Sequence, residues 1–247
     1  MKRPEYEKMY ALEDSHWWFV GRRRLLTTLI ERWIVFGPQD RVLDVGCGTG
    51  GNLAHLTQPG IGVGVDLSPL ALDLARHRSL IRLTQASGLA LPYPTHTFKL
   101  VTMFDVLYHR WIIDDEQAIR EAYRVLQPGG WLLLTDAALP LLWSTHDEVY
   151  YARQRYTLND ILEKLTRTGF NVRVCSYVNT LLLPLVAVAR LVADRFLPVD
   201  HFTLRPSPAW MNKLFIGVWQ LEARWLGWGG TLPLGSSLIC LTQKNLN

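Results

Sequence analysis

Short apolar runs alternate with amphipathic stretches through most of the 247 residues. The amphipathic stretches carry apolar residues at helical spacing, as in Ala118, Ile119, Ala122 and Leu126. We expect seven strands, at 42–45, 62–66, 80–85, 100–104, 131–135, 171–176 and 237–242. Helices are expected at 5–36, 52–57, 69–77, 114–126 and 157–168. Strands that alternate with helices predict a doubly wound, Rossmann-like α/β fold around a parallel sheet.

The pattern predicts that residues 1–247 form one domain made of three parts. These parts are an N-terminal helical cap (1–38), a Rossmann-like core (39–177 and 231–247) and an apolar helical insertion before the last strand (178–230). Ser68 followed by Pro69 predicts the start of one core helix, because serine is a good N-cap and proline fits the first helical position.

The insertion contains the most apolar part of the chain. The run from Leu181 to Ala189 is shorter than the roughly 20 residues that a membrane span needs, and Asn179 and Pro184 interrupt it. We therefore expect a buried or membrane-facing element and not a span. Two interpretations stay open: a second core cover or homodimer interface, or a tunnel or surface for a lipophilic substrate that allows peripheral membrane contact.

Charge and cysteine usage exclude several classes of partner. The formal net charge is only +4, and basic residues are scattered apart from Arg22–Arg24, so no nucleic-acid partner is expected. The three cysteines have no paired spacing, which argues against disulfides and zinc and favours a reducing compartment. The N-terminus is too charged for a signal peptide. A cytoplasmic location is expected, with membrane association left open.

The chemistry is concentrated where the first two strands end. The first strand opens into a turn with Gly46, Gly48 and Gly51, and the second ends at Asp66. Glycine tolerates positive φ and leaves room for a ligand, and an acid at a strand end can bind both hydroxyls of a ribose. The pattern predicts a site for a nucleotide-like cofactor. Taken alone, the G-x-G-x-x-G spacing also permits NAD.

A longer series of motifs resembles the class I S-adenosylmethionine-dependent methyltransferases. The matching segments are Asp44–Gly50, Val65–Ser68, Leu91–Pro94, Phe104–His109 and Arg124–Gly130. The resemblance covers residues 40–136 strongly, and it implies a seven-stranded sheet whose last strand is antiparallel. It also implies S-adenosylmethionine as cofactor, with S-adenosylhomocysteine as product.

The resemblance assigns the cofactor-binding residues by position. Asp44, Gly46 and Gly48 would hold the methionine end, Asp66 the ribose, and Leu67 the adenine. Many relatives have an acid where this chain has Ser87, so a serine must replace it at the adenine edge. An N-terminal segment like that of one branch of these enzymes would add an apolar lid and an arginine. The remaining expected cofactor contacts are Trp17, Arg22, Cys47, Gly88, Asp105 and Val106.

Two histidines are the candidate catalytic residues. His109 follows the fourth strand, where the acceptor of the methyl group usually lies in the family, and His146 lies in a polar and aromatic loop after the fifth strand. Histidine titrates near neutrality and can accept a proton from an attacking hydroxyl or amine. We also expect substrate contacts from Tyr108, Tyr150 and Arg155. No metal site is expected.

The sequence therefore predicts an enzyme that methylates oxygen or nitrogen of a small-molecule acceptor, such as a natural product or a sugar- or lipid-linked intermediate. An NAD(P)-dependent oxidoreductase is the first alternative, although Tyr150, Tyr151 and Tyr156 have no lysine four residues later. A non-catalytic protein that binds S-adenosylmethionine and assists another enzyme is the second alternative.

Overall fold

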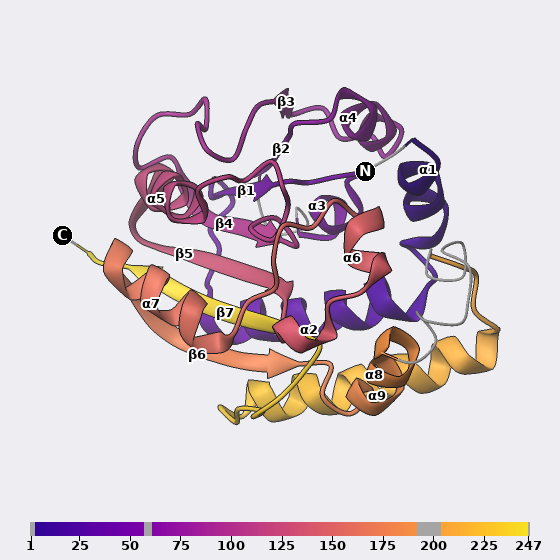
Figure 1. Cartoon of the computed structure of the whole chain (residues 1–247). Coiled ribbons are helices and arrows are strands. Elements are labelled where there is room, and N and C mark those ends of the chain that lie inside the picture. The colour runs from indigo at the N-terminus through magenta and orange to yellow at the C-terminus, as the bar shows by residue number, and fades with distance from the viewer. Residues whose placement is uncertain (1–2, 57–60, 192–203, 247) are drawn as a thin grey trace.

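A computed structural model describes residues 3–56, 61–191 and 204–246 of the chain. They form a seven-stranded sheet of order β3-β2-β1-β4-β5-β7-β6, in which β7 alone runs antiparallel to its neighbours. The strands are β1 (Arg41–Val45), β2 (Ile61–Asp66), β3 (Leu83–Gln85), β4 (Phe98–Phe104), β5 (Leu126–Ala137), β6 (Phe170–Val178) and β7 (Ser237–Lys244). The predicted Rossmann-like sheet with an antiparallel last strand is confirmed (Figure 1).

Helices cover both faces of the sheet (Figure 1). They are α1 (Arg3–Leu12), α2 (Trp17–Trp33), α3 (Gly51–Leu56), α4 (Pro69–Arg76), α5 (Asp115–Val125), α6 (Thr145–Val149), α7 (Leu158–Thr168), α8 (Leu183–Leu191) and α9 (Ala209–Gly227), with a short 3-10 turn, η1 (Pro140–Leu142). The chain moves outward from β1 to β2 and β3 and then returns to β4 on the other side of β1. Ligands of such sheets bind at this reversal, outside the carboxyl ends of the strands.

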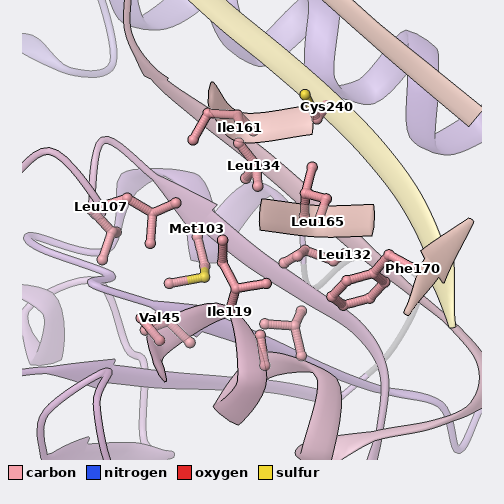
Figure 2. Close-up of a cluster of buried hydrophobic side chains, with 14 of the residues drawn as sticks. Val45, Met103, Leu107, Ile119, Leu132, Leu134, Ile161, Leu165, Phe170 and Cys240 are labelled. Atoms are coloured by element: carbon pink, nitrogen blue, oxygen red, sulfur yellow. The ribbon is translucent and has the colours of Figure 1, made fainter. Parts of the chain in front are cut away.

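Two hydrophobic clusters hold the layers together. One cluster lies between the sheet and α5 and α7, and Figure 2 shows Ile161 and Leu165 beside Leu134 and Leu132 of β5, with Ile119 beside Met103 of β4. The other lies between the opposite face of the sheet and α2 and α9. Because strand side chains alternate between faces, the same strands supply both clusters. The carboxyl ends of the strands are thus fixed from both sides.

Local signals place several helix ends as expected. Ser68 caps α4 by accepting a hydrogen bond from the Ala71 N–H, with Pro69 at the first helical position. Thr157 begins α7 with a capping box, and Gly169 ends it in the left-handed conformation. These ends depend on residues close in sequence, which is why the pattern predicts them.

The single helix expected at 5–36 is wrong, because the structure has two helices there, α1 and α2. The chain breaks between Glu13 and His16, and His16 caps α2 by accepting from the Trp18 N–H. The Glu13 carboxylate is bound by the Thr49 hydroxyl and by Arg78. The chain turns at this point, and α1 lies over the end of the sheet (Figure 1).

The insertion supplies α8 and α9, and α9 packs along α2. The contact is close at Gly21, where a Cβ atom would come within 2.5 Å of the Trp219 ring. In the described part of the chain, every helix is too short or too polar to cross a membrane.

Candidate active site

A cavity of about 810 Å³ lies at the carboxyl ends of β1, β2 and β4. Helices α1, α6 and α8 gather around this end of the sheet (Figure 1). The structure brings together sixteen of the seventeen predicted site residues on its wall. They are Trp17, Arg22, Gly46, Cys47, Gly48, Asp66, Leu67, Ser87, Gly88, Asp105, Val106, Tyr108, His109, His146, Tyr150 and Arg155.

The glycine turn after β1 requires glycine for two reasons. Gly46, Gly48 and Gly50 have φ angles of 70°, 54° and 84°, which side chains other than glycine rarely adopt. A Cβ atom on Gly46 would also come within 2.6 Å of the Val106 side chain. The turn therefore brings bare backbone to the cavity wall.

Asp66 is fixed at the end of β2 by backbone donors. Its Oδ2 accepts from the Gly48 N–H at 2.9 Å, and its Oδ1 accepts from the Ser68 N–H at 2.8 Å. Burial raises the pKa of this carboxyl above its ordinary value. Leu67 follows and is 46% exposed, so its side chain is available to a ligand in the cavity.

Asp44 is the one predicted site residue that does not line the cavity. It is 2% exposed and lies behind the glycine turn, where its Oδ1 accepts from the Thr102 hydroxyl at 2.7 Å. Burial raises its pKa to about 7. From this position, the Asp44 side chain does not reach the cavity.

Arg22 of α2 forms an ion pair with Asp105, which follows β4. Asp105 adopts a φ of 57°, in the left-handed region, and this turns its carboxylate toward the cavity. The Arg22 side chain is 7% exposed, and its Nε–H is buried with no hydrogen-bond partner. A guanidinium at a cavity wall fits an anionic ligand group.

Helix α1 and the break after it contribute wall residues that sequence reasoning missed. Tyr6 lies near Asp66, and burial together with that negative charge raises the tyrosine pKa to about 12. Glu13 accepts from the Thr49 hydroxyl at 2.6 Å and pairs with Arg78 at 2.8 Å. The sequence does contain a signal for these wall residues, because Tyr6, Met9 and Glu13 are spaced as residues on one face of a helix. The contact between Glu13 and Thr49 thus connects the N-terminal cap to the glycine turn.

His109 lies in the loop after β4, beside the cavity. Its ring stacks near Trp111, with ring centroids 6.1 Å apart, and its backbone bridges to Ala152. Burial lowers the pKa of His109 to about 4, so the ring is neutral at pH 7. It can accept a proton, but only as a weak base.

His146, Tyr150 and Arg155 belong to a second polar cluster on the wall. Asp147 joins two cations, Arg155 at 2.8 Å and Arg190 of α8 at 2.9 Å. The His146 Nδ1 lies 3.3 Å from an Arg190 nitrogen, and burial lowers the His146 pKa well below its ordinary value. Arg155 also donates to the Ala138 carbonyl. Arg155 therefore binds groups of the protein itself and stabilises the cavity wall.

The remaining predicted contacts have partners within the protein. Ser87 accepts from the Leu89 N–H at 3.1 Å, so its hydroxyl shapes the loop beside the cavity. The Trp17 ring packs against Phe215 of α9, with centroids 5.0 Å apart. Burial raises the pKa of Tyr108, which keeps its hydroxyl protonated. Across the described ranges, His, Cys, Asp and Glu form no group of three that could hold a metal ion.

Residues 43–134 match the family described as a methyltransferase domain, and this span contains the glycine turn, Asp66 and Asp105. The chain contains a class I S-adenosylmethionine-dependent methyltransferase domain. Its fold agrees with a putative methyltransferase solved in complex with the Haloferax volcanii activator Trm112. That structure has a TM-score of 0.62 at 19% identity, with 98% of this chain and 97% of that one covered.

Curated relatives of the methyltransferase domain include two bacterial demethylmenaquinone methyltransferases. The protein from Symbiobacterium thermophilum is 35% identical over 116 residues, which cover 42% of this chain and 45% of that protein. The protein from Thermus thermophilus is 33% identical over 149 residues, covering 56% and 63%. The chain thus spans about half the length of the curated relatives it matches. A solved geranyl diphosphate C-methyltransferase from Streptomyces coelicolor shares the fold, with a TM-score of 0.60 at 16% identity over 88% and 74% of the two chains.

The residues present fit the cofactor of a class I methyltransferase domain. The bare backbone of the glycine turn, the fixed carboxylate of Asp66 and the side chain of Arg22 line one cavity. An acid that ends a strand suits the ribose hydroxyls of S-adenosylmethionine, and the backbone of the turn together with an arginine suits its methionine end.

Proposed function

We propose that the protein transfers the methyl group of S-adenosylmethionine to an oxygen or nitrogen of a small-molecule acceptor. One observation carries the proposal: the glycine turn and Asp66 share a single cavity with His109, His146 and Tyr150. The first group suits the cofactor, and the second provides polar atoms for an acceptor. The names of the curated relatives support a small molecule, such as a natural product or a sugar- or lipid-linked intermediate.

The cofactor supplies a methyl group already activated on a sulfonium, so the protein has mainly to position the acceptor and exclude water. In this proposal Asp66 holds the ribose hydroxyls and Leu67 packs on the adenine. Arg22 binds the methionine carboxylate with its guanidinium group while it stays beside Asp105. Trp17 and Tyr6 cover the cavity from the N-terminal side.

Proton removal limits which acceptors suit the site. Both histidines are neutral at pH 7, because burial lowers their pKa values. An arginine can only donate, so the His146 Nδ1 accepts from Arg190 and its proton lies on Nε2. His146 therefore has a donor and no acceptor left on its ring, and His109 is the remaining general-base candidate. With a pKa of about 4, it suits an acceptor that is a neutral amine or that loses its proton easily.

Calorimetric titration with S-adenosylhomocysteine and, separately, NADH tests the cofactor. We expect binding of S-adenosylhomocysteine alone, and a loss of roughly 100-fold or more in Asp66→Ala, because two charge-assisted hydrogen bonds to the ribose disappear. The exposed Asp73→Ala is the matched control and should bind normally. Binding of NADH alone would contradict the proposal and favour an oxidoreductase.

Turnover separates an enzyme from a non-catalytic binding protein. The purified protein is incubated with S-adenosylmethionine and panels of amine, phenol and carboxylate acceptors, and S-adenosylhomocysteine formation is measured. We expect acceptor-dependent formation that the Asp66→Ala variant loses. Tight cofactor binding without turnover on any class would contradict the methyl-transfer proposal and favour the binding protein.

A further inference from the structure

Helix α9 exposes apolar side chains along its whole length. The exposed residues are Trp210, Leu214, Leu221 and Trp225 of the helix and Trp228, which caps its C-terminus; each is between 49% and 78% exposed, and we call them the α9 outer face. Their spacing of three, four or seven residues keeps them on one side of the helix. The opposite side holds Trp219 and Leu226, which are buried against α2. The outer face is therefore not needed to attach α9 to the protein.

The charges on α9 are distributed by sign. Lys213 and Arg224 are exposed, and they lie on one flank of the outer face, eleven residues or three turns apart. The acid of the helix, Glu222, is 3% exposed and turned inward, where it accepts from the backbone N–H groups of Asn179 and Leu181. The helix thus presents apolar and positive groups outward and keeps its negative charge inside.

We propose that the α9 outer face docks the protein on an anionic lipid bilayer, with the helix lying in the plane of the membrane. Tryptophan favours the boundary between headgroups and acyl chains, and the face carries tryptophans at both ends. A helix of this kind buries its apolar side at the boundary, while flanking cations bind anionic headgroups. The proposal goes beyond the methyltransferase function and does not depend on it.

The position of the insertion connects this surface with the cavity. Helix α8 belongs to the same insertion, and its Leu185 and Val188 are 54% and 58% exposed. Its Val186 and Ala189 line the cavity. A protein docked through the insertion would hold the acceptor end of its cavity close to the lipid surface.

A second copy of the chain suits the α9 outer face less well. The face is about 28 Å long and about one helix wide, which is well below the roughly 800 Å² per partner of a standard interface. Two antiparallel α9 helices related by a two-fold axis would also place Lys213 of one copy against Arg224 of the other. These like charges would repel across the interface.

Vesicle co-sedimentation of the full chain tests the proposal. The vesicles are phosphatidylcholine alone and phosphatidylcholine mixed with phosphatidylglycerol, each at low and high salt. We expect binding to the anionic vesicles that weakens with salt, because screening reduces the contribution of Lys213 and Arg224. Leu221→Glu should weaken binding at least tenfold, because a charge replaces a membrane-buried side chain. Ile81→Glu is the matched control, since Ile81 is 82% exposed and lies outside the face.

Two further measurements make the result decisive. S-adenosylhomocysteine titration shows that Leu221→Glu keeps a folded cofactor site, and size-exclusion chromatography reports the oligomeric state. Vesicle binding that Leu221→Glu loses and Ile81→Glu keeps supports the proposal. Absence of binding to either vesicle type, or equal binding by the two variants, would overturn it. A dimer that only Leu221→Glu dissolves, without vesicle binding, would assign the face to a second copy instead.

Discussion

The two halves of the cavity are built in different ways. The half that we propose for the cofactor, called the cofactor half, consists of the glycine turn and Asp66, which lie on the ends of adjacent parallel strands and are held by backbone hydrogen bonds. The half that we propose for the acceptor, called the acceptor half, is formed by His109, His146 and Arg190, which come from a loop, a short helix and the insertion. The glycine turn and Asp66 are thus positioned mainly by the sheet, with Glu13 of the N-terminal cap bound to Thr49 of the turn. The acceptor half depends on ion pairs between segments far apart in the sequence, so it can vary while the cofactor site stays the same.

Removing the carboxylate that holds the acceptor half should give the largest effect. Asp147→Asn leaves Arg155 and Arg190 without their shared anion, and the Arg155 side chain is 1% exposed. We expect the free energy of unfolding to fall by about 3–5 kcal/mol, as for other broken buried ion pairs. Denaturant unfolding measures this loss, with the exposed Asp73→Asn expected to change by less than about 0.5 kcal/mol.

If the two halves are independent, Asp147→Asn must leave the affinity for the cofactor unchanged. The folded variant should bind S-adenosylhomocysteine with nearly normal affinity, because the glycine turn and Asp66 do not contact Asp147. A loss of cofactor affinity as large as the loss expected in Asp66→Ala would show that the two halves are not independent.

The cofactor half should respond to pH through Asp44. Burial raises the Asp44 pKa from 3.8 to about 7, so between these values the folded protein keeps a proton that the unfolded chain has released. Stability therefore decreases as pH rises through this window, by up to about 4 kcal/mol for this group. Between pH 5 and pH 8 this group accounts for about 3 kcal/mol of the loss, and in Asp44→Asn, which stays neutral, the decline over that range should be smaller by about that amount. Unfolding titrations at pH 5 and pH 8 measure it, and parallel declines in both proteins would refute the assignment.

The smallest effect is expected at His109. A ring with a pKa of about 4 stays neutral from pH 6 to pH 8, so it should cause no inflection of kcat in that range. We expect His109→Gln to lower kcat by about tenfold, because so weak a base contributes mainly by positioning the acceptor. An inflection near pH 6.5 that disappears in the variant would instead identify His109 as a titrating base.

The difference between the halves also explains what the sequence could predict. Strands, the capping residues Ser68 and Thr157 and the glycine turn all follow from neighbouring residues, and the pattern predicts them. The break between α1 and α2 has a local signal in the capping residue His16, but the ion pair of Glu13 with Arg78, 65 residues away, cannot be read from neighbouring residues. The missing direct contact of Asp44 with the cavity likewise depends on Thr102 of the neighbouring strand.

The arginines illustrate the same limit. A run of three at Arg22–Arg24 is equally typical of a solvated helix surface and of a ligand site, and only the approach of Asp105 distinguishes Arg22. Arg190 reaches Asp147 across 43 residues, from an insertion that the pattern describes only as apolar. Pairings of this kind are set by tertiary packing, which the hydrophobic pattern does not encode.

The contact between Gly21 and the Trp219 ring has a structural consequence. Gly21 precedes Arg22 in α2, and Trp219 lies on the inner side of α9 behind its outer face. Any side chain at position 21 would meet the ring, so the absence of one sets how closely α2 and α9 approach. The position of the helix that carries Arg22 to the cavity wall thus depends on a hydrogen atom at residue 21.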